Sequence, residues 1–391
     1  MIESINIENY NYPLPDNRIA SYPLQERDAS RLLHYQKGAI SDKHFTDLHK
    51  LLPPGSLLVF NNTRVVPARL LFSKDSGAII EIFCLEPIDP KEYNLSFAST
   101  RSVVWRTIIG NKKRWKSGTI SNAILSAECI NQEEDTYIVR FQWNNQLTFS
   151  EILELCGKIP IPPYLRRDSD DVDIERYQTI YAAWRGSVAA PTAGLHFSDS
   201  IISSLKENKI SLSEITLHVG AGTFMPVKTE LIARHTMHSE PFTVSLSFLE
   251  TLYAHKGDVV AVGTTSARCL ESLYHFGLMC YMGKEPVFLP QWDAYSVKPL
   301  LSREESLEQI ITYLHRHSFT SFSAHTQIMI VPSFSFRWIN GLITNFHQPK
   351  STLLLLIAAF IGEDWRRCYE HALKNEYRFL SYGDSSLLFP E

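Results

Sequence analysis

The chain has 391 residues, of which 44% are hydrophobic and 20% are charged, and its formal net charge at pH 7 is -4. This length exceeds what one hydrophobic core usually supports, so two domains are expected. The composition excludes a disordered chain and a coiled coil, and the negative charge excludes a protein that coats nucleic acid through overall positive charge.

The six cysteines lie far apart and form no CxxC pair. We interpret them as reduced thiols in a reducing compartment. The start of the chain has neither the basic nor the apolar region of a secretory signal. The longest apolar run, residues 353–361, is shorter than the roughly 20 residues that span a bilayer. We therefore expect a cytoplasmic protein without a membrane segment, and a buried helix or strand at this run.

The first part of the chain predicts a proline-rich loop, a charged turn at residues 25–28 and a strand at residues 56–60. From about residue 61 to 150, short β-rich runs are separated by Gly, Asn or Ser turns. These runs are residues 78–85, 102–109 and 136–142. The pattern is typical of a small all-β unit of barrel or sandwich type.

After residue 151, helical and strand patterns alternate. The sequence predicts helices at residues 173–183, 199–207, 266–276 and 302–317, the last of them solvated, and strands at residues 214–219 and 258–262. Such alternation indicates a layered α/β domain with mostly parallel strands. We therefore expect an α/β domain that is interrupted by a β domain.

Three segments of small and polar residues can line a ligand pocket. Residues 186–197 contain Thr192, Gly194 and His196, although a tight packing loop is an alternative. Residues 216–224 and 261–268 each lead from an apolar strand into glycine and hydroxyl side chains, where α/β sheets expose backbone N–H groups to ligands. The positions concerned are Gly220, Gly222, Thr223, Thr264, Thr265 and Ser266. Two such strand ends can meet at one edge and bind a nucleoside, whereas a lone Gly-x-Gly is as typical of a plain turn.

Histidines and an acid in and around these segments suit general acid–base chemistry. The candidate catalytic residues are His196, His218, His238, Glu240 and His347. His235 and His238 are three residues apart, but neither an HExxH motif nor a cysteine partner accompanies them, so we expect no metal site.

Residues 101–118 carry six positive and no negative side chains, interleaved with Trp105 and Trp115. Because Lys and Arg contact phosphates and aromatic rings stack on unpaired bases, the segment suits an RNA loop. A solvated hairpin with core tryptophans is the alternative. The candidate RNA-binding residues are Arg101, Trp105, Lys112, Lys113 and Lys116, together with Arg166 and Arg167.

Together these segments resemble, over nearly the whole chain, the S-adenosylmethionine:tRNA ribosyltransferase-isomerase (QueA) family of queuosine biosynthesis. The most specific ones are residues 58–69 (LVFNNTRVVPAR), 159–164 (IPIPPY), 186–197, 237–240 (MHSE) and 343–347 (ITNFH). The resemblance implies that the ribosyl portion of S-adenosylmethionine moves onto 7-aminomethyl-7-deazaguanine at the tRNA wobble position. Epoxyqueuosine forms, and adenine and methionine leave.

The resemblance also implies an architecture and partners. A β-barrel at residues 63–151 is inserted into a discontinuous α/β catalytic domain of residues 1–62 and 152–391. S-adenosylmethionine is the cosubstrate, no metal is required, and the remaining partner is tRNA that carries 7-aminomethyl-7-deazaguanine. We expect a monomer that does not contact membranes.

Several residues depart from the family pattern. Asn62 stands where the family usually has Asp, Ser333 where it has Gly, and Asn340 where it has an acid; Gln348 replaces a leucine. These departures leave two alternatives open. One is a paralogue that binds RNA or S-adenosylmethionine without transfer, and the other is an enzyme that uses a different acceptor.

Overall fold

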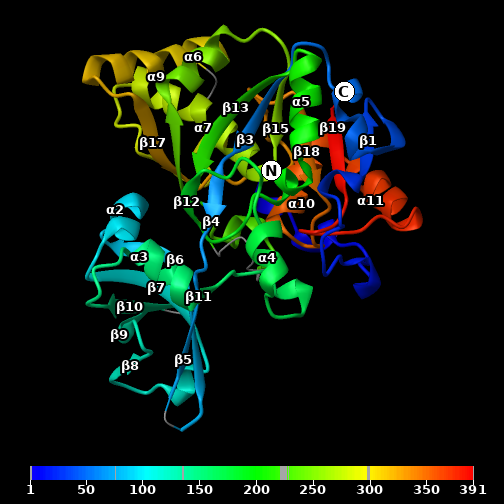
Figure 1. Cartoon of the computed structure of the whole chain (residues 1–391). Coiled ribbons are helices and arrows are strands. Elements are labelled where there is room, and N and C mark those ends of the chain that lie inside the picture. The colour runs from blue at the N-terminus through cyan, green and yellow to red at the C-terminus, as the bar shows by residue number, and fades with distance from the viewer. Residues whose placement is uncertain are drawn as a thin grey trace.

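The structure is a computed structural model that describes residues 2–74, 76–133, 136–220, 227, 229–296 and 300–390, with only the backbone of Asn94. In these residues the strands form a ten-stranded sheet, a seven-stranded sheet and a two-stranded ribbon (Figure 1). The order of the large sheet is β16 (Phe288–Leu289), β17 (Ser321–Thr326), β14 (Glu240–Ser245), β13 (Ser211–Leu217), β3 (Leu57–Asn61), β15 (Val259–Val262), β18 (Gly341–Asn345), β19 (Ser385–Phe389), β1 (Arg31–Gln36) and β2 (Ala39–His44).

The large sheet is mixed. Its centre, β13-β3-β15-β18, is parallel, as predicted for this part of the chain. However, β14 is antiparallel to both β13 and β17, β18 is antiparallel to β19, and β1 is antiparallel to β2. Outside the centre, β16 also pairs with β17 and β19 with β1 in parallel. The strands are therefore mostly parallel, as predicted, and tight connections such as the β1–β2 hairpin produce the antiparallel pairs.

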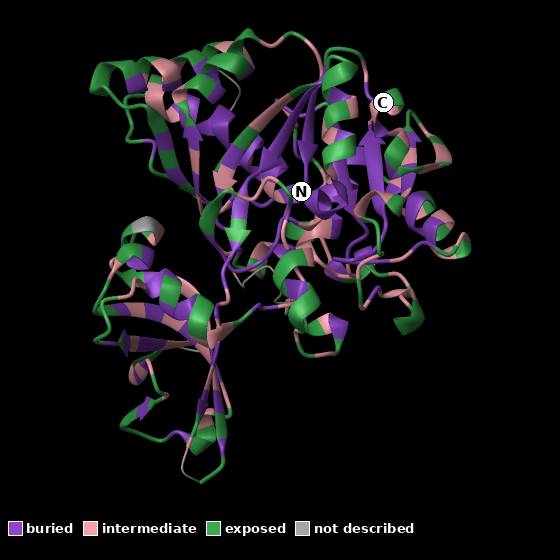
Figure 2. Cartoon of the chain, viewed as in Figure 1, coloured by how far each residue is buried: buried purple, intermediate pink, exposed green. Residues whose placement is uncertain are grey.

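Helices cover both faces of the large sheet. In the described residues the α-helices are α1 (Leu48–Leu51), α2 (Tyr93–Ala98), α3 (Phe149–Cys156), α4 (Asp171–Arg176), α5 (Asp199–Glu207), α6 (Leu246–Ala254), α7 (Thr264–Tyr281), α8 (Asp293–Ser296), α9 (Arg303–His317), α10 (Thr352–Ile361) and α11 (Asp364–Lys374). Along β3, Leu57 and Val59 join the core with α7 and α9, while Leu58 and Phe60 join the core with α1 and α5. Every residue of β3, β15 and β18 is buried, as expected for parallel strands covered on both faces (Figure 2).

The smaller sheet lies beside this layered unit and is entirely antiparallel (Figure 1). Its order is β11 (Gly157–Lys158), β5 (Arg69–Ser73), β6 (Ile79–Asp89), β7 (Ser102–Gly110), β10 (Thr136–Gln142), β9 (Ser126–Glu133) and β8 (Thr119–Ser121). The sheet curls until β5 and β8 come into contact, but no ladder joins β11 to β8 among the described residues. The predicted barrel is thus curled and open.

The large-sheet and small-sheet units are joined near the two-stranded ribbon and near helix α3. The ribbon pairs β4 (Thr63–Val65) with β12 (Trp184–Ser187) in parallel. The domain junction predicted between residues 151 and 152 falls inside α3, which packs Phe149, Ile152 and Leu153 into the core of the small sheet. Since β11 beyond it still pairs with β5, we propose that the boundary follows Lys158.

One predicted helix is shorter than expected. The helix at residues 173–183 is α4, which ends at Arg176. Gln178 ends it through tertiary bonds: its Oε1 accepts from Val65 N (2.9 Å) and its Nε2 donates to Val65 O (2.8 Å). The apolar run at residues 353–361 forms the buried helix α10, and α9 buries Leu307, Ile310 and Leu314, so it is less solvated than predicted. Within the described ranges, every helix is too short or too polar to cross a membrane.

Candidate functional site

A pocket opens at the carboxyl ends of β15 and β18. Its walls are residues 189–193, 263–265 and 344–353, with Tyr164, Tyr177, Val219, Leu380 and Ser381. The location follows from topology, because parallel central strands end at one edge and the loops that leave them diverge there.

Two helices begin at this pocket. Helix α7 starts at Thr264, directly after Gly263, whose φ of 89° is favourable only for glycine. Helix α10 starts at Thr352 and is capped by Ser351, whose side chain accepts from Leu354 N. Free N–H groups and the helix dipole make both ends favourable for an anionic group.

The side-chain oxygen of Asn345 is a hydrogen-bond acceptor that is available to a ligand. Its side chain is 3% exposed and lines the pocket at the end of β18. Its Nδ2 donates to His196 Nε2 at 3.1 Å, while its Oδ1 has no hydrogen-bond partner in the part of the chain that the structure describes. Since buried polar atoms are normally paired, this oxygen is suited to accept from a ligand.

His347 lines the pocket, and His196 lies beside it; the pKa values of both histidines are lowered. His347 Nε2 is 2.9 Å from Thr344 Oγ1, and burial lowers the pKa of His347 to about 3. His196 lines an adjoining smaller pocket that shares Ser381. Burial, with smaller contributions from Arg378 and Arg27, lowers the pKa of His196 to about 4.

The predicted cosubstrate-binding residues separate into three groups: those that line the pocket, those that do not, and those outside the described residues. Thr192, Thr264 and Thr265 line the pocket. Gly194 instead allows close packing, since a Cβ there would come within 1.9 Å of Tyr181 Oη, and Ser266 Oγ donates to the carbonyl of Val262. Gly220 lies outside the lining, and Gly222 and Thr223 lie outside the described residues.

A second polar cluster lies at the same edge of the sheet, where antiparallel β14 begins beside the end of β13. His238 Nε2 is 3.1 Å from Glu240 Oε1, and Arg268 Nη1 donates to Glu240 Oε2 at 2.5 Å. Burial alone would raise the pKa of Glu240, but Arg268 and His238 together hold it below its usual value. Glu240 is therefore a buried carboxylate.

His218 connects the two units. Its ring stacks on Tyr93 of α2, with centroids 4.8 Å apart and planes at 7°. A Cβ on Gly186 would lie 2.5 Å from its Nδ1, so the ring is packed tightly. Burial lowers the pKa of His218 to about 4.

Two of the predicted RNA-binding residues make contacts within the protein. Trp105 is buried and cannot stack on an unpaired base, whereas Arg167 is partly exposed, so its contact with RNA stays a prediction. Trp105 is fully buried in the small-sheet core, where its Nε1 donates to Ser96 Oγ. Arg167 makes two 2.7 Å bonds to the buried Asp173 and lies over the ring of Tyr22. The alternation of apolar residues along β7 is the signal that could have placed Trp105 in the core.

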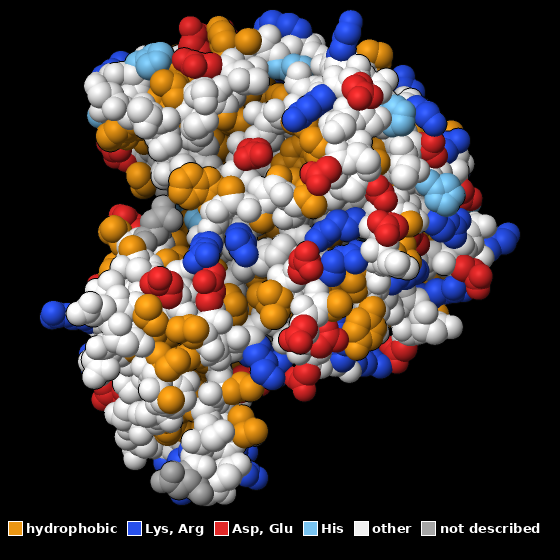
Figure 3. All heavy atoms as spheres, in the orientation of Figure 1, with side chains coloured by type: hydrophobic (Ala, Val, Ile, Leu, Met, Phe, Trp, Pro, Cys, Tyr) orange, Lys and Arg blue, Asp and Glu red, His pale blue; other side chains and the backbone are white. Residues whose placement is uncertain are grey.

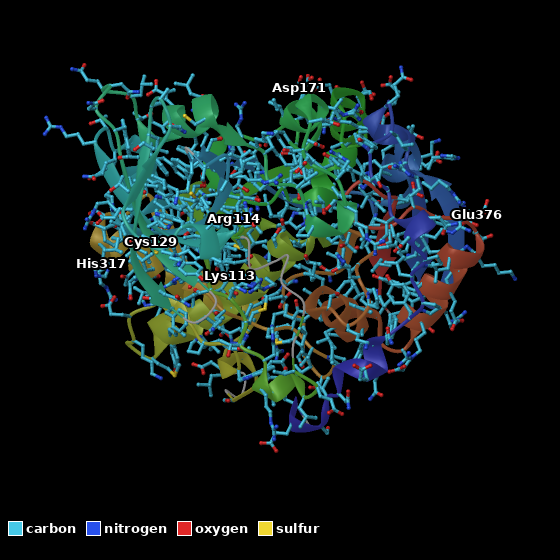
Figure 4. All side chains as sticks on the ribbon, turned by 90° about the horizontal axis from the view of Figure 1, so that it is seen from below. Lys113, Arg114, Cys129, Asp171, His317 and Glu376 are labelled. Atoms are coloured by element: carbon cyan, nitrogen blue, oxygen red, sulfur yellow. The ribbon has the colours of Figure 1, made fainter. Side chains whose placement is uncertain are left out.

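The other predicted RNA-binding residues are more accessible. Arg101, Lys113 and Lys116 are exposed, and so is Arg166, which pairs with Asp16. Lys112 is half-buried, and its Nζ donates to Trp115 O. In the view from below, Lys113 and Arg114 lie next to each other on the small-sheet unit (Figure 4). Lys, Arg, Asp and Glu are interspersed on the face in Figure 3. Among the residues described, this face therefore has no extended positively charged surface.

Sequence reasoning missed Asn345, Ser351 and Arg268. All three lie in or beside motifs of the family resemblance, but their roles depend on which hydrogen bonds remain unfilled after folding. Among the described residues, no group of three or more His, Cys, Asp or Glu side chains could hold a metal ion.

A pocket at the carboxyl ends of parallel strands, beside two helix N-termini, defines an α/β ligand-binding protein. The family described as queuosine biosynthesis protein matches residues 7–388. The chain therefore belongs to the queuosine biosynthesis protein family, which confirms the resemblance. Among solved structures, it is similar to a crystal structure of S-adenosylmethionine tRNA ribosyltransferase from Thermotoga maritima, with 27% sequence identity and a TM-score of 0.47 over 97% of this chain and 99% of that chain.

Proposed function

We propose that the protein is an S-adenosylmethionine:tRNA ribosyltransferase-isomerase. It moves the ribosyl portion of S-adenosylmethionine onto 7-aminomethyl-7-deazaguanine at the tRNA wobble position, gives epoxyqueuosine and releases adenine and methionine. Membership of the queuosine biosynthesis family supports this proposal. We further propose that it acts as a monomer in the cytoplasm and needs no metal.

The observation that carries the proposal is the pocket between α7 and α10. S-adenosylmethionine has a carboxylate, for which the N–H groups at Thr264 or Thr352 are suited. It also has hydroxyl and ammonium donors, for which Asn345 Oδ1 is an available acceptor.

Two departures from the family pattern do not touch this pocket. Asn62 Nδ2 donates to Glu214 at 2.9 Å, and its Oδ1 accepts from Thr216 at 2.8 Å. Asn340 Oδ1 accepts from Val259 N at 3.0 Å, at the start of β18. Since both amides have structural partners, their replacement of acids is no reason to prefer a paralogue without transfer activity.

The direct test incubates purified protein with S-adenosylmethionine and tRNA that carries 7-aminomethyl-7-deazaguanine, followed by mass analysis of the digested nucleosides. Epoxyqueuosine and free adenine are the expected products. If S-adenosylmethionine binds but the nucleoside stays unchanged while a known family member converts it, the binding-only alternative replaces the proposal.

Charge reversal tests whether tRNA, rather than a free deazapurine, is the acceptor. In the variant Lys113→Glu/Lys116→Glu we expect weaker tRNA binding and a salt slope that is smaller by roughly 1 to 2, because each lost phosphate contact removes about 0.7 to 0.9 from it. The control, Lys206→Glu/Lys209→Glu, changes the charge equally on the large-sheet unit. If the charge reversal at Lys113 and Lys116 leaves turnover unchanged, the result would support a free deazapurine as the acceptor.

A further inference from the structure

The cluster of His238, Glu240 and Arg268 has a buried hydrogen-bond donor that is available to a ligand. Arg268 is 4% exposed; its Nε donates to Ile328 O at 3.1 Å and its Nη1 to Glu240. Its Nη2 has no partner among the described residues. A buried guanidinium with a free N–H group is costly in a purely structural cluster, so this group is suited to an incoming ligand.

Glu240 determines the tautomer of His238. An ionised carboxylate can only accept hydrogen bonds, so the proton of a neutral His238 ring is on Nε2, 3.1 Å from Glu240 Oε1. Nδ1 then carries the free electron pair. The His238 side chain is 26% exposed while that of Glu240 is 1% exposed, so the ring is anchored on its buried side and accessible on the other. This arrangement orients a general base.

Helix α7 connects this cluster to the cosubstrate pocket. Thr264 and Thr265 line the pocket, and Arg268 lies one helical turn further along, where it holds Glu240. Because β14 runs antiparallel to β13, Glu240 begins its strand at the edge where the parallel strands end. The pocket and the cluster are therefore on one edge of the large sheet.

The other histidines proposed as bases are less suited to this role. His196, His218 and His347 are each less than 10% exposed. Burial lowers their pKa values to about 4, 4 and 3, respectively. A base whose conjugate acid is so strong retains a transferred proton poorly at neutral pH.

We propose that His238 is the catalytic base of the ribosyl transfer and that Glu240 and Arg268 are its positioning residues, which rests on the proposed function. His238 Nδ1 takes a proton from the ribosyl carbon bonded to the sulfonium sulfur. The C–H bond breaks, the N–H bond forms, and the electron pair stays on that carbon next to the positive sulfur. The resulting imidazolium keeps its Nε2–H bond to Glu240, which offsets the new charge.

The test compares His238→Ala and His238→Gln with the matched control His235→Ala, which removes a half-buried histidine from the same loop. Turnover and deuterium incorporation into S-adenosylmethionine are measured in D2O with modified tRNA. We expect kcat to fall about 100-fold or more in both His238 variants, with the KM for S-adenosylmethionine changed less than about threefold. Deuterium incorporation should fall in parallel, and added imidazole should restore part of the rate to His238→Ala.

Glu240→Gln tests the positioning role. It should lower kcat with little change in KM, because Gln can donate to the ring and permit the wrong tautomer, and Glu240→Asp should restore part of the loss. The inference is overturned if wild-type protein makes epoxyqueuosine and both His238 variants keep at least half of its kcat, or if His235→Ala loses as much. A wild-type protein without product overturns the proposed function and this inference with it.

Discussion

Ser333 is a serine in a backbone conformation that favours glycine. Pro332 and Ser333 are the central residues of a turn closed by Phe334 N and Val331 O at 3.0 Å, and the φ of Ser333 is 89°. This is the third position of a type II turn, where a side chain clashes with the backbone. The serine is exposed and makes no side-chain hydrogen bond among the described contacts, so nothing offsets the strain.

We therefore predict that Ser333→Gly raises the free energy of unfolding by about 1 kcal/mol, the usual cost of this conformation in a residue with a Cβ. Urea unfolding measures the change. The control, Ser203→Gly in the exposed middle of α5, should instead lower stability by about 0.5 kcal/mol. Equal effects of the two substitutions would contradict the argument from the turn.

At the scale of elements, α7 organises the large-sheet unit. Its first turn reaches the pocket and Arg268 holds Glu240. Further along, the buried Glu271 accepts from the backbone N–H groups of Arg337, Trp338 and Ile339, which fixes the loop before β18. Gly277 then lets α9 approach, since a Cβ there would lie 2.0 Å from the carbonyl oxygen of Ser306.

Gly277→Ala should lower the free energy of unfolding by about 3 kcal/mol, although alanine favours helix, because the obstructing atom belongs to the backbone and cannot rotate away. Thermal and urea unfolding check this. Gly220→Ala is the control, because among the residues that the structure describes its Cβ would meet only Leu85 O, at 4.0 Å. If Gly277→Ala were neutral, the close contact between α7 and α9 would be wrong.

At the scale of the whole molecule, buried neutral histidines make folding depend on pH. Besides the three at the site, burial, with a smaller contribution from Arg337, lowers the pKa of His275 to about 4. The unfolded chain binds protons at these positions below about pH 6.5, whereas the folded chain excludes them until about pH 4. Each group therefore removes stability as the pH falls through this window.

We predict that His275→Gln loses less stability between pH 7 and pH 5 than the wild type, by about 2 kcal/mol. Taking the difference between the two proteins cancels other titrating groups, including Glu271, whose pKa burial raises to about 7. The exposed His317 provides the control His317→Gln, which should retain the wild-type slope. Parallel curves for wild type and His275→Gln would contradict the prediction.

The sequence by itself determined features that local physics decides. Helix α5 has the predicted bounds because Ser198 caps Ile201 N and Ile201 and Leu205 form an apolar stripe. The strand at residues 136–142 likewise follows from its β-branched and aromatic residues. Thr264 and Thr265 line the pocket, as their position after a predicted strand suggests, because central parallel strands end at a common edge; their contact with a ligand stays a prediction.

Only the tertiary structure decided which polar groups remain free. Gln178 ended a predicted helix by bonding Val65, more than a hundred positions away. Gly194 is a packing residue against Tyr181, Trp105 lies in the small-sheet core, and Arg167 bonds to Asp173. Asn345 Oδ1 and Arg268 Nη2 distinguish the proposed site because, within the described ranges, other polar atoms of these side chains have hydrogen-bond partners and these two have none. Which polar atoms lack a partner depends on contacts between segments that are distant in the sequence, so no local sequence pattern predicts it.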